Sequence, residues 1–283
     1  MSKVVVFGAN GMAGHVVSSY LKMAGHDVTR IARENADVCL DIKSKSLLDS
    51  YFLGYSGLGG AYIINCIGLL VKECESTPSD AVYINSWFPH YLAGMSKRIG
   101  AKLIHISTDC VFNGSKGSYK ENDIKDGIGM YAQSKSLGEV VNDHDLTIRT
   151  SIVGPELKNG TGLFHWFMSQ QGQVNGYTNA FWGGVTTLEL AKYIEWVIHT
   201  PLTGLCHLTN GERVSKFYML DCFNFYTGRR SIVTPTKAAT EIDKSIVNTR
   251  GDNTFKVQSY DYMFEQMVDY IRQNKELYSR YLS

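Results

Sequence analysis

Short apolar segments rich in β-branched residues alternate with amphipathic stretches through the first half of the chain. Residues 4–8 predict a strand, and residues 12–24 carry apolar side chains at helical spacing before Gly25 ends the helix. Further strands are predicted at 27–32, 61–67, 102–107 and 146–150, with helices at about 79–97 and 130–141. Strands that alternate with helices through short connections are typically parallel and joined by right-handed crossovers. The pattern therefore predicts an α/β fold built on a doubly wound parallel sheet.

The pattern changes after about Ser151. Glycine and aromatic residues crowd segments 160–167 and 172–184, and one clear helix is predicted at 187–199. Short strand-like pieces follow residue 203, then a polar stretch at 236–253 and a terminal helix at 260–281 whose tyrosines are expected to pack. We therefore expect a sheet domain in residues 1–150, with 185–200 packing back onto it, and a smaller C-terminal lobe in 151–283.

Composition excludes several classes of protein. The chain holds 28 Lys and Arg against 27 Asp and Glu, a net charge of +1, and 44% of its residues are apolar. Such a chain is neither a disordered polyampholyte nor a basic binder of nucleic acid or membrane surfaces. The longest apolar run, at about 61–71, is shorter than the roughly 20 residues of a membrane-spanning helix, and the first residues show no cationic leader. The six cysteines and the histidines show no metal-ligand spacing, so we expect reduced thiols, no metal site and a cytoplasmic location.

The first predicted turn has the spacing G-x-x-G-x-x-G. Gly8 permits a tight turn, Gly11 lets the backbone approach a pyrophosphate, and Gly14 allows close packing of helix on sheet. The helix that begins here offers free N–H groups and the positive end of its dipole to phosphate. Between a strand and an amphipathic helix, this spacing predicts a Rossmann dinucleotide-binding turn, with Asn10 and Met12 also at the cofactor.

Residues near the end of the second predicted strand select the cofactor. An acidic side chain there binds the ribose hydroxyls of NAD, whereas an arginine suits the additional 2′-phosphate of NADP. Arg33 is the first candidate and Arg30 the second, so we expect NADP(H). If Glu34 faces the ribose in place of Arg33, the cofactor is NAD(H). A third alternative is that both arginines are simply surface residues.

A candidate catalytic pair lies in the helix predicted at 130–141. Tyr131 and Lys135 are four residues apart and so share one face of the helix. A nearby ammonium favours tyrosinate, so Lys135 is expected to lower the pKa of Tyr131 into the range useful for proton transfer. Thr108 follows the predicted strand at 102–107, at the edge of the sheet where such folds bind ligands, and is placed to hold a carbonyl oxygen.

Together these motifs resemble an extended short-chain dehydrogenase/reductase and, within that family, its dTDP-4-dehydrorhamnose reductase branch. The resemblance covers about residues 3–155 and rests on the glycine turn and on segments 65–68, 107–114, 119–121, 131–139 and 149–151. It implies reduction of a nucleotide-linked 4-keto-6-deoxy sugar with NADP(H), in the synthesis of surface polysaccharides. A sugar-nucleotide epimerase of the same fold and a non-catalytic, cofactor-binding regulatory subunit are the alternatives.

The resemblance also implies roles for individual residues. Tyr131 is the expected proton donor, Lys135 binds the nicotinamide ribose, and Thr108 orients the substrate carbonyl. Further cofactor contacts are expected from Asp41, Ile42, Cys66, Ile67 and Gly68. Substrate contacts are expected from Asn85, Asp109, Val111, Phe181, Trp182 and Thr186, with the lobe in 151–283 holding sugar and nucleotide. A structural role is the alternative for three of these: a buried hydrogen bond to backbone for Asn85, and core packing for Phe181 and Trp182.

Two departures from the family pattern bear on the substrate. Cys110 stands where the sugar-nucleotide dehydratases carry a glutamate, so elimination of water lacks its second carboxylate. Residues 176–186 replace the D-Q-x-G-x-P-T type of segment found in the reductases, which leaves the nucleotide and the sugar open. Because members of the family pair through the helices that correspond to 79–97 and 130–141, a homodimer is one further expectation.

Overall fold

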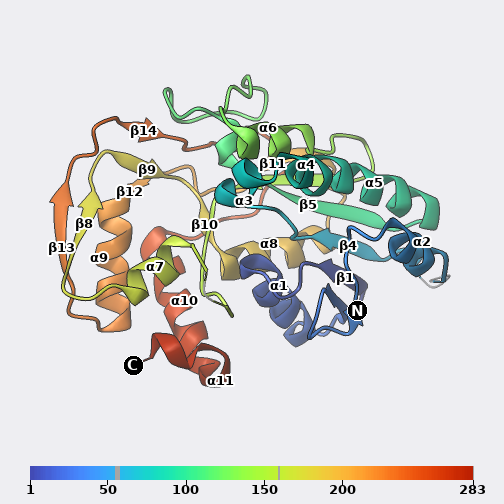
Figure 1. Ribbon diagram of the computed structural model, residues 1–283, viewed down its shortest axis with the longest axis horizontal. Helices are drawn as coiled ribbons and strands as arrows, with labels where there is room; N and C mark the ends of the chain where they lie inside the picture. Colours follow the sequence, from blue (N-terminus) through green and yellow to red (C-terminus); the bar gives the residue numbers. More distant parts are fainter. Residues whose placement is uncertain (55–57, 159, 283) are drawn as a thin grey trace.

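The structure, a computed structural model, describes residues 1–54, 58–158 and 160–282. Its centre is a seven-stranded sheet in the order β11-β6-β5-β4-β1-β2-β3, and every pairing in that sheet is parallel (Figure 1). The strands are β1 (Lys3–Phe7), β2 (Asp27–Ala32), β3 (Val38–Cys39), β4 (Tyr62–Asn65), β5 (Lys102–Thr108), β6 (Leu146–Thr150) and β11 (Gly204–His207). The doubly wound parallel sheet predicted from the sequence is confirmed.

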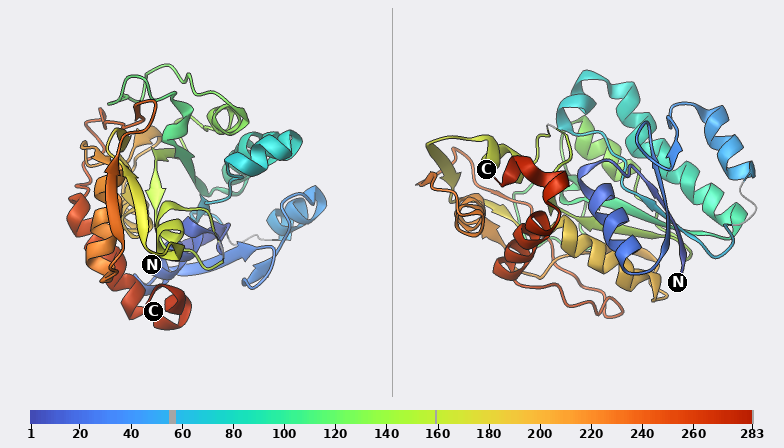
Figure 2. Two further views of the ribbon diagram at one scale, coloured as in Figure 1. Left: turned by 60° about the vertical axis from the view of Figure 1, so that its left-hand side comes forward. Right: turned by 90° about the horizontal axis from the view of Figure 1, so that it is seen from below.

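Helices cover both faces of the sheet (Figures 1 and 2). They include α1 (Met12–Met23), α2 (Lys45–Gly54), α5 (Phe88–Ile99) and α8 (Thr187–Ile198). Val4 and Val6 of β1 belong to one core with α1 and α8, which pack against each other. Val5 and Phe7 belong to a second core with α2 and α5. Because both faces are buried, the central strands β1 and β4 are almost continuously apolar instead of alternating between apolar and polar residues.

The helix that carries the candidate catalytic pair, α6 (Met130–Leu137), packs closely on a π-helical segment (Val82–Trp87). This segment joins α4 (Pro78–Ala81) to α5, so the helix predicted at 79–97 is continuous but locally widened. A Cβ at Gly138 would lie 1.8 Å from the carbonyl oxygen of Asn85, and only glycine permits that approach. Helix α6 ends at this contact, four residues before the predicted end at residue 141.

Several elements were not predicted from the sequence, either because they lack a clear apolar pattern or because they are very short. Helix α9 (Lys216–Thr227) interleaves aromatic and polar residues without a clear apolar stripe. Strand β3 has only two residues, whereas β11, with four, is one of the short strand-like pieces expected after residue 203. The terminal helix predicted at 260–281 is α10 (Tyr260–Gln273), followed by the short helix α11 (Lys275–Tyr278) and a final 3₁₀ turn.

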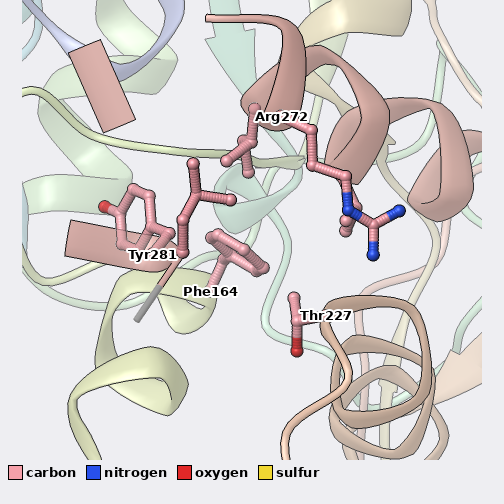
Figure 3. A pocket seen from close by; sticks show the side chains of 7 residues that line it. Phe164, Thr227, Arg272 and Tyr281 are labelled. Atoms are coloured by element: carbon pink, nitrogen blue, oxygen red, sulfur yellow. The ribbon is translucent and has the colours of Figure 1, made fainter. Parts of the chain in front are cut away.

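A smaller lobe lies beyond the carboxyl edge of the sheet (Figure 1). It contains α9, α7 (Leu163–Ser169), and the parallel strands β8 (Gln173–Tyr177) and β13 (Ile232–Thr236). Of the tyrosines expected to pack in the C-terminal helices, Tyr262 is exposed. The other four are buried, namely Tyr260, Tyr270, Tyr278 and Tyr281. A cavity of about 150 Å³ between α7, α9 and the C-terminal helices contains none of the candidate site residues (Figure 3). Among the described residues, no helix combines the length and the apolar character needed to cross a bilayer.

Candidate active site

The turn between β1 and α1 is built on glycines that leave no room for side chains. Gly8 has a φ of +78°, and a Cβ there would lie 2.9 Å from Cγ1 of Ile67. A Cβ on Gly14 would lie 2.1 Å from the carbonyl oxygen of Gly8, so α1 begins directly against the turn. Gly11 donates its N–H to that carbonyl oxygen at 2.9 Å. Gly8 and Gly14 therefore have the turn and packing roles that their spacing predicts.

The start of α1 fits a phosphate group. Its N-cap is Gly11, which offers no side-chain acceptor, so the first N–H groups of the helix, beginning with Met12, stay available to an anion. Asn10 is engaged elsewhere, because its Nδ2 donates to the carbonyl oxygen of Glu34 at 2.6 Å. This bond ties the turn to the segment after β2. The residues of the turn thus fit a dinucleotide pyrophosphate, with Asn10 as a positioning residue.

The charged residues at the end of β2 and directly after it differ in their surroundings. Arg30 bonds Asp37 through Nε at 3.3 Å and Nη2 at 3.0 Å. Glu34 pairs with Lys158, and this hydrogen bond lowers the pKa of Glu34. Arg33 is exposed and has no ion-pair partner among the residues that the structure describes. Of the three, Arg33 is the residue whose charge is open to a ligand.

Two further expected cofactor residues follow β3. Asp41 is exposed and accepts the N–H of Lys43 at 3.0 Å, which shapes its own turn. Ile42 is buried, and its carbonyl oxygen accepts the hydroxyl of Tyr83 at 3.0 Å. Because β3 is parallel to β2, both residues lie at the edge of the sheet that carries the glycine turn.

The loop after β4 connects the glycine turn with the catalytic helix. Cys66 donates its N–H to the carbonyl oxygen of Phe7 at 3.0 Å, and Ile67 touches the Cβ position of Gly8. On the other side, the Cβ position of Gly68 is 3.9 Å from Nζ of Lys135. The structure therefore brings Cys66, Ile67 and Gly68 together with both parts of the candidate site.

The side chain of Asn85 is hydrogen-bonded inside the protein. Its side chain is fully buried in the π-helical segment, where Oδ1 accepts the N–H of Leu69 at 2.8 Å. Its Nδ2 lies 3.1 Å from the Leu69 carbonyl oxygen and 3.2 Å from Oγ of Ser134 on α6. The burial and bonding of Asn85 give the substrate contact expected of it no support, and that contact stays a prediction. The structural alternative holds, because the amide fixes the loop after β4 against the catalytic helix.

Thr108, Tyr131 and Lys135 meet at the carboxyl end of β5. The Thr108 hydroxyl is near enough to that of Tyr131 to lower its pKa, and Thr108 Oγ1 lies 3.2 Å from Oδ1 of Asp109. One turn further along α6, Nζ of Lys135 donates to the carbonyl oxygen of Ile106 in β5 at 2.8 Å. The two functional groups of α6 thus point toward the same strand, as their four-residue spacing predicts.

The pKa of Tyr131 differs from the expectation. Burial raises it, and the neighbouring Cys110 and Asp109 add to the rise, while the hydrogen bond from Thr108 opposes it. Burial also lowers the pKa of Lys135 to about 8, with Glu139 opposing. The expected lowering of the Tyr131 pKa by Lys135 is therefore wrong for this arrangement, since desolvation of the phenol dominates. Tyr131 is consequently protonated at neutral pH and can donate its proton.

Cys110 lies beside this set and cannot replace a carboxylate. Burial raises the pKa of its thiol to about 11, and the neighbouring Asp109 adds to the rise. The thiol is therefore neutral at physiological pH. A neutral thiol is a weak hydrogen-bond donor and a poor general base.

Two lysines that sequence reasoning missed face the site from the smaller lobe. Burial raises the pKa of Asp109, and the charges of Lys244 and Lys216 oppose the rise. Lys216 is the first residue of α9, and burial lowers its pKa while Asp109 opposes. No spacing in the sequence marks these lysines, because only the folding of the lobe onto the sheet brings them to Asp109.

Three of the expected substrate contacts stay predictions without support, because in the structure these side chains serve packing or capping. Trp182 is buried, and its Nε1 donates to Oγ of Ser151 at 2.9 Å. Thr186 is the N-cap of α8, where Oγ1 accepts the N–H of Glu189 at 3.2 Å. Val111 is buried in a small apolar cluster after β5.

Phe181 is half-buried, and a cation covers one face of its ring. The guanidinium carbon of Arg213 lies 4.0 Å from the ring centroid, and Arg213 also pairs with Asp243. Stacking of a base or sugar is thus confined to the other face of Phe181, and this contact stays a prediction.

A buried ion pair lies behind the catalytic residues. Glu139 accepts Nε and Nη2 of Arg149, both at 2.8 Å, and Oγ of Ser107 at 2.8 Å. The side chains of Arg149 and Glu139 are only 2% and 1% exposed. Because Ser107 precedes Thr108 and Glu139 lies one turn beyond Lys135, the pair ties β5 and β6 to the end of α6. The resemblance drew attention to these segments without indicating this role.

The parallel sheet, the glycine turn and the Thr–Tyr–Lys set at one edge define a protein of the extended short-chain dehydrogenase/reductase type. Comparison with known families makes the assignment more specific. The chain belongs to the family described as the RmlD substrate binding domain, whose model matches residues 2–244.

Three known proteins show how far the similarity extends. The chain is 35% identical over 164 residues to the spore coat polysaccharide biosynthesis protein SpsK of Bacillus subtilis, covering 54% of each. It is 29% identical over 143 residues to dTDP-4-dehydrorhamnose reductase of Mycobacterium tuberculosis, covering 48% of this chain and 44% of that protein. A solved dTDP-4-dehydrorhamnose reductase from Bacillus anthracis, in complex with NADP, aligns over 95% of this chain and 99% of its own, with a TM-score of 0.81 and 24% identity. The aligned regions span about half of the two curated relatives, and the structural likeness confirms the fold.

Proposed function

We propose that the protein reduces a nucleotide-linked 4-keto-6-deoxy sugar with NADP(H), in the synthesis of a surface polysaccharide. The observation that carries this proposal is the meeting of Thr108, Tyr131 and Lys135 at the edge that also holds the glycine turn. Two relatives, a dTDP-4-dehydrorhamnose reductase and a polysaccharide biosynthesis protein, support the same reaction class. NAD(H) is the alternative cofactor.

When bound, NADP(H) would supply a hydride to the keto carbon, and side chains of this protein would hold and protonate the keto oxygen. Thr108 Oγ1 holds the carbonyl oxygen, and the Tyr131 hydroxyl gives it a proton as it becomes an alkoxide. The ammonium of Lys135, one turn further along α6, would stabilise the charge of the phenolate. The raised pKa of Tyr131 suits a proton donor, and the neutral thiol of Cys110 offers no base for eliminating water.

The lysines of the smaller lobe fit the diphosphate of a nucleotide sugar. With a net charge of +1, the whole molecule provides no basic surface to attract an anion. Lys216 and Lys244 instead place positive charge where it acts on Asp109, the residue after Thr108. We assign the substrate diphosphate to these lysines and the sugar to the space between Asp109 and Tyr131.

A direct test incubates the protein with NADPH and a panel of dTDP-, UDP- and GDP-linked 4-keto-6-deoxy sugars. We expect NADPH absorbance to fall with at least one substrate, one equivalent per product, and NMR to show a new hydroxyl-bearing carbon at position 4. Epimerised product without net consumption of NADPH would overturn the proposal in favour of an epimerase. Tight cofactor binding without turnover of any substrate would overturn it in favour of a regulatory subunit.

Arg33→Ala is expected to raise the KM for NADPH about 10- to 100-fold, since a charge-assisted hydrogen bond contributes about 1.5–3 kcal/mol. The KM for NADH should change little, because NADH has no 2′-phosphate. Arg30→Ala is the matched control, since Asp37 already holds Arg30. Equal effects of Arg33→Ala on both cofactors would contradict recognition of the 2′-phosphate by this residue.

Turnover is expected to fall as the pH rises through about 8, where buried Lys135 loses its proton. Below that pH the lysine is charged and can stabilise the phenolate; above it the charge is lost. Burial raises the pKa of Tyr131, so the phenol itself does not titrate in this range. The pH profile of kcat measures the effect. The activity that remains in Lys135→Arg should not decline with pH, because arginine stays charged. A wild-type profile that is flat to pH 9.5 would contradict this role.

We also propose a homodimer and a cytoplasmic location. Val82 of the π-helical segment and Leu137 of α6 are exposed apolar residues on the helices expected to pair. Of the six cysteines, all unpaired in the structure, five are at least partly buried, as expected for a reducing compartment. Light scattering of the purified protein tests the dimer, and Leu137→Glu should dissociate it.

A further inference from the structure

Two histidines and a glutamate meet at the edge of the sheet opposite the candidate active site. His26 directly precedes β2, and Glu195 and His199 lie at the C-terminal end of α8. One ligand atom from each of the three side chains lies within 4.8 Å of the other two, and Nε2 of His199 is 3.2 Å from Oε1 of Glu195. Among the described residues, no other group of three His, Cys, Asp or Glu side chains converges in this way.

We propose that His26, Glu195 and His199 form a binding site for a divalent transition-metal ion, with Zn²⁺ as the preferred ion. Two imidazoles and one carboxylate form a ligand set typical of zinc, and water would complete the coordination. Imidazole ligands also suit Ni²⁺ and Co²⁺, whereas Mg²⁺ and Ca²⁺ require oxygen ligands.

The local geometry allows the site to close on an ion. Metal–nitrogen bonds of about 2.0–2.1 Å in a tetrahedral site place ligand atoms roughly 3.3 Å apart. The glutamate and His199 already meet this spacing, and their side chains are 32% and 56% exposed and therefore free to turn. His26 is buried and provides the fixed ligand. The backbone N of Ser2 donates to Nδ1 of His26 at 3.3 Å. Because this hydrogen bond is long, its loss costs little free energy if the imidazole changes tautomer to bind a metal.

The surroundings favour a cation and give it a structural role. Glu195 and His199 are four residues apart on one face of α8, at the end of the helix that carries the negative side of its dipole. Strand β2 belongs to the central sheet, whereas α8 covers it. A bound ion would therefore cross-link the sheet to its covering helix, two elements that lie far apart in the sequence. The sequence conceals this site, because His26 lies about 170 residues before the Glu-x-x-x-His pair.

The test uses the full-length, untagged protein at pH 7.5, because a histidine tag would bind the same metals. All variants carry Cys39→Ser, which removes the one thiol classed as exposed. We expect one equivalent of Co²⁺ to produce visible absorption bands that Zn²⁺ abolishes, and Zn²⁺ to raise the melting temperature. His199→Ala and Glu195→Gln should each weaken Co²⁺ binding at least about tenfold, since even the loss of an outer partner of a metal ligand costs 10–100-fold.

His90→Ala is the matched control, since His90 is exposed and lies outside the cluster. Its Co²⁺ affinity should equal that of the parent. Affinity that is equal in all three variants and the parent, or the absence of any Co²⁺ signal, would overturn the proposal. Reductase activity should be the same with Zn²⁺ and with a chelator, so this test succeeds or fails independently of the proposed reaction.

Discussion

Tyr131→Phe is expected to lower kcat for NADPH-dependent reduction by about 10²–10⁴-fold, the usual contribution of a positioned general acid. The substitution removes only the hydroxyl, whose pKa Thr108 influences, and keeps the ring. The alkoxide formed at the keto oxygen then lacks its proton donor. Cofactor binding should be unchanged, because the glycine turn and the loop after β4 stay intact. Steady-state kinetics and NADPH fluorescence titration measure the two quantities separately.

Tyr262→Phe provides the control for this experiment. Tyr262 is an exposed residue of α10, and its hydroxyl meets only the neighbouring Gln266 within the part of the chain that the structure describes. Its kcat should match the wild type. If Tyr131→Phe kept wild-type turnover, Tyr131 would not be the proton donor, and the proposed mechanism would fail. A loss of NADPH binding in Tyr131→Phe would show a structural role in place of a chemical one.

The parts of the site that local spacing controls were predictable from the sequence. Gly8 and Gly14 act within one turn and one helix, and Tyr131 and Lys135 within two turns of α6. The positions of these residues follow from the backbone geometry of one short segment, so the sequence of that segment is enough to predict them. The strands flanking the glycine turn were predictable for the same reason.

Residues whose role depends on partners distant in the chain were not predictable. Asn85 matches a family position, but its amide atoms are used by Leu69 and Ser134. Lys216 reaches Asp109 only because the smaller lobe folds over the sheet. The pKa of Tyr131 shows the same limit: spacing places Lys135 nearby, but the burial that raises the pKa comes from the whole surrounding structure.

Glu139→Gln is expected to lower the free energy of unfolding by about 3–5 kcal/mol, which is the usual cost of breaking a buried ion pair. The substitution leaves the Arg149 guanidinium without a countercharge in an interior where its side chain is 2% exposed. Lys125, 3.1 Å from Glu139 Oε2, also loses its partner. Because the total free energy of unfolding of a protein is about 5–15 kcal/mol, this loss is a large fraction of it. Urea unfolding followed by tryptophan fluorescence measures the change.

The pH dependence separates the ion pair from a packing effect. Burial alone would raise the pKa of Glu139, but Arg149 and Lys125 hold it below its ordinary value of 4.5. The stabilisation is therefore complete above that value and is lost as the pH falls through the lower pKa of the folded state. The difference between wild type and Glu139→Gln should accordingly shrink in acid. Asp269→Asn, which breaks an exposed pair with Arg272, should change stability by no more than about 1 kcal/mol. An equally small change for Glu139→Gln would mean that the remaining hydrogen bonds of Arg149, including the one to His207, compensate its charge without the carboxylate.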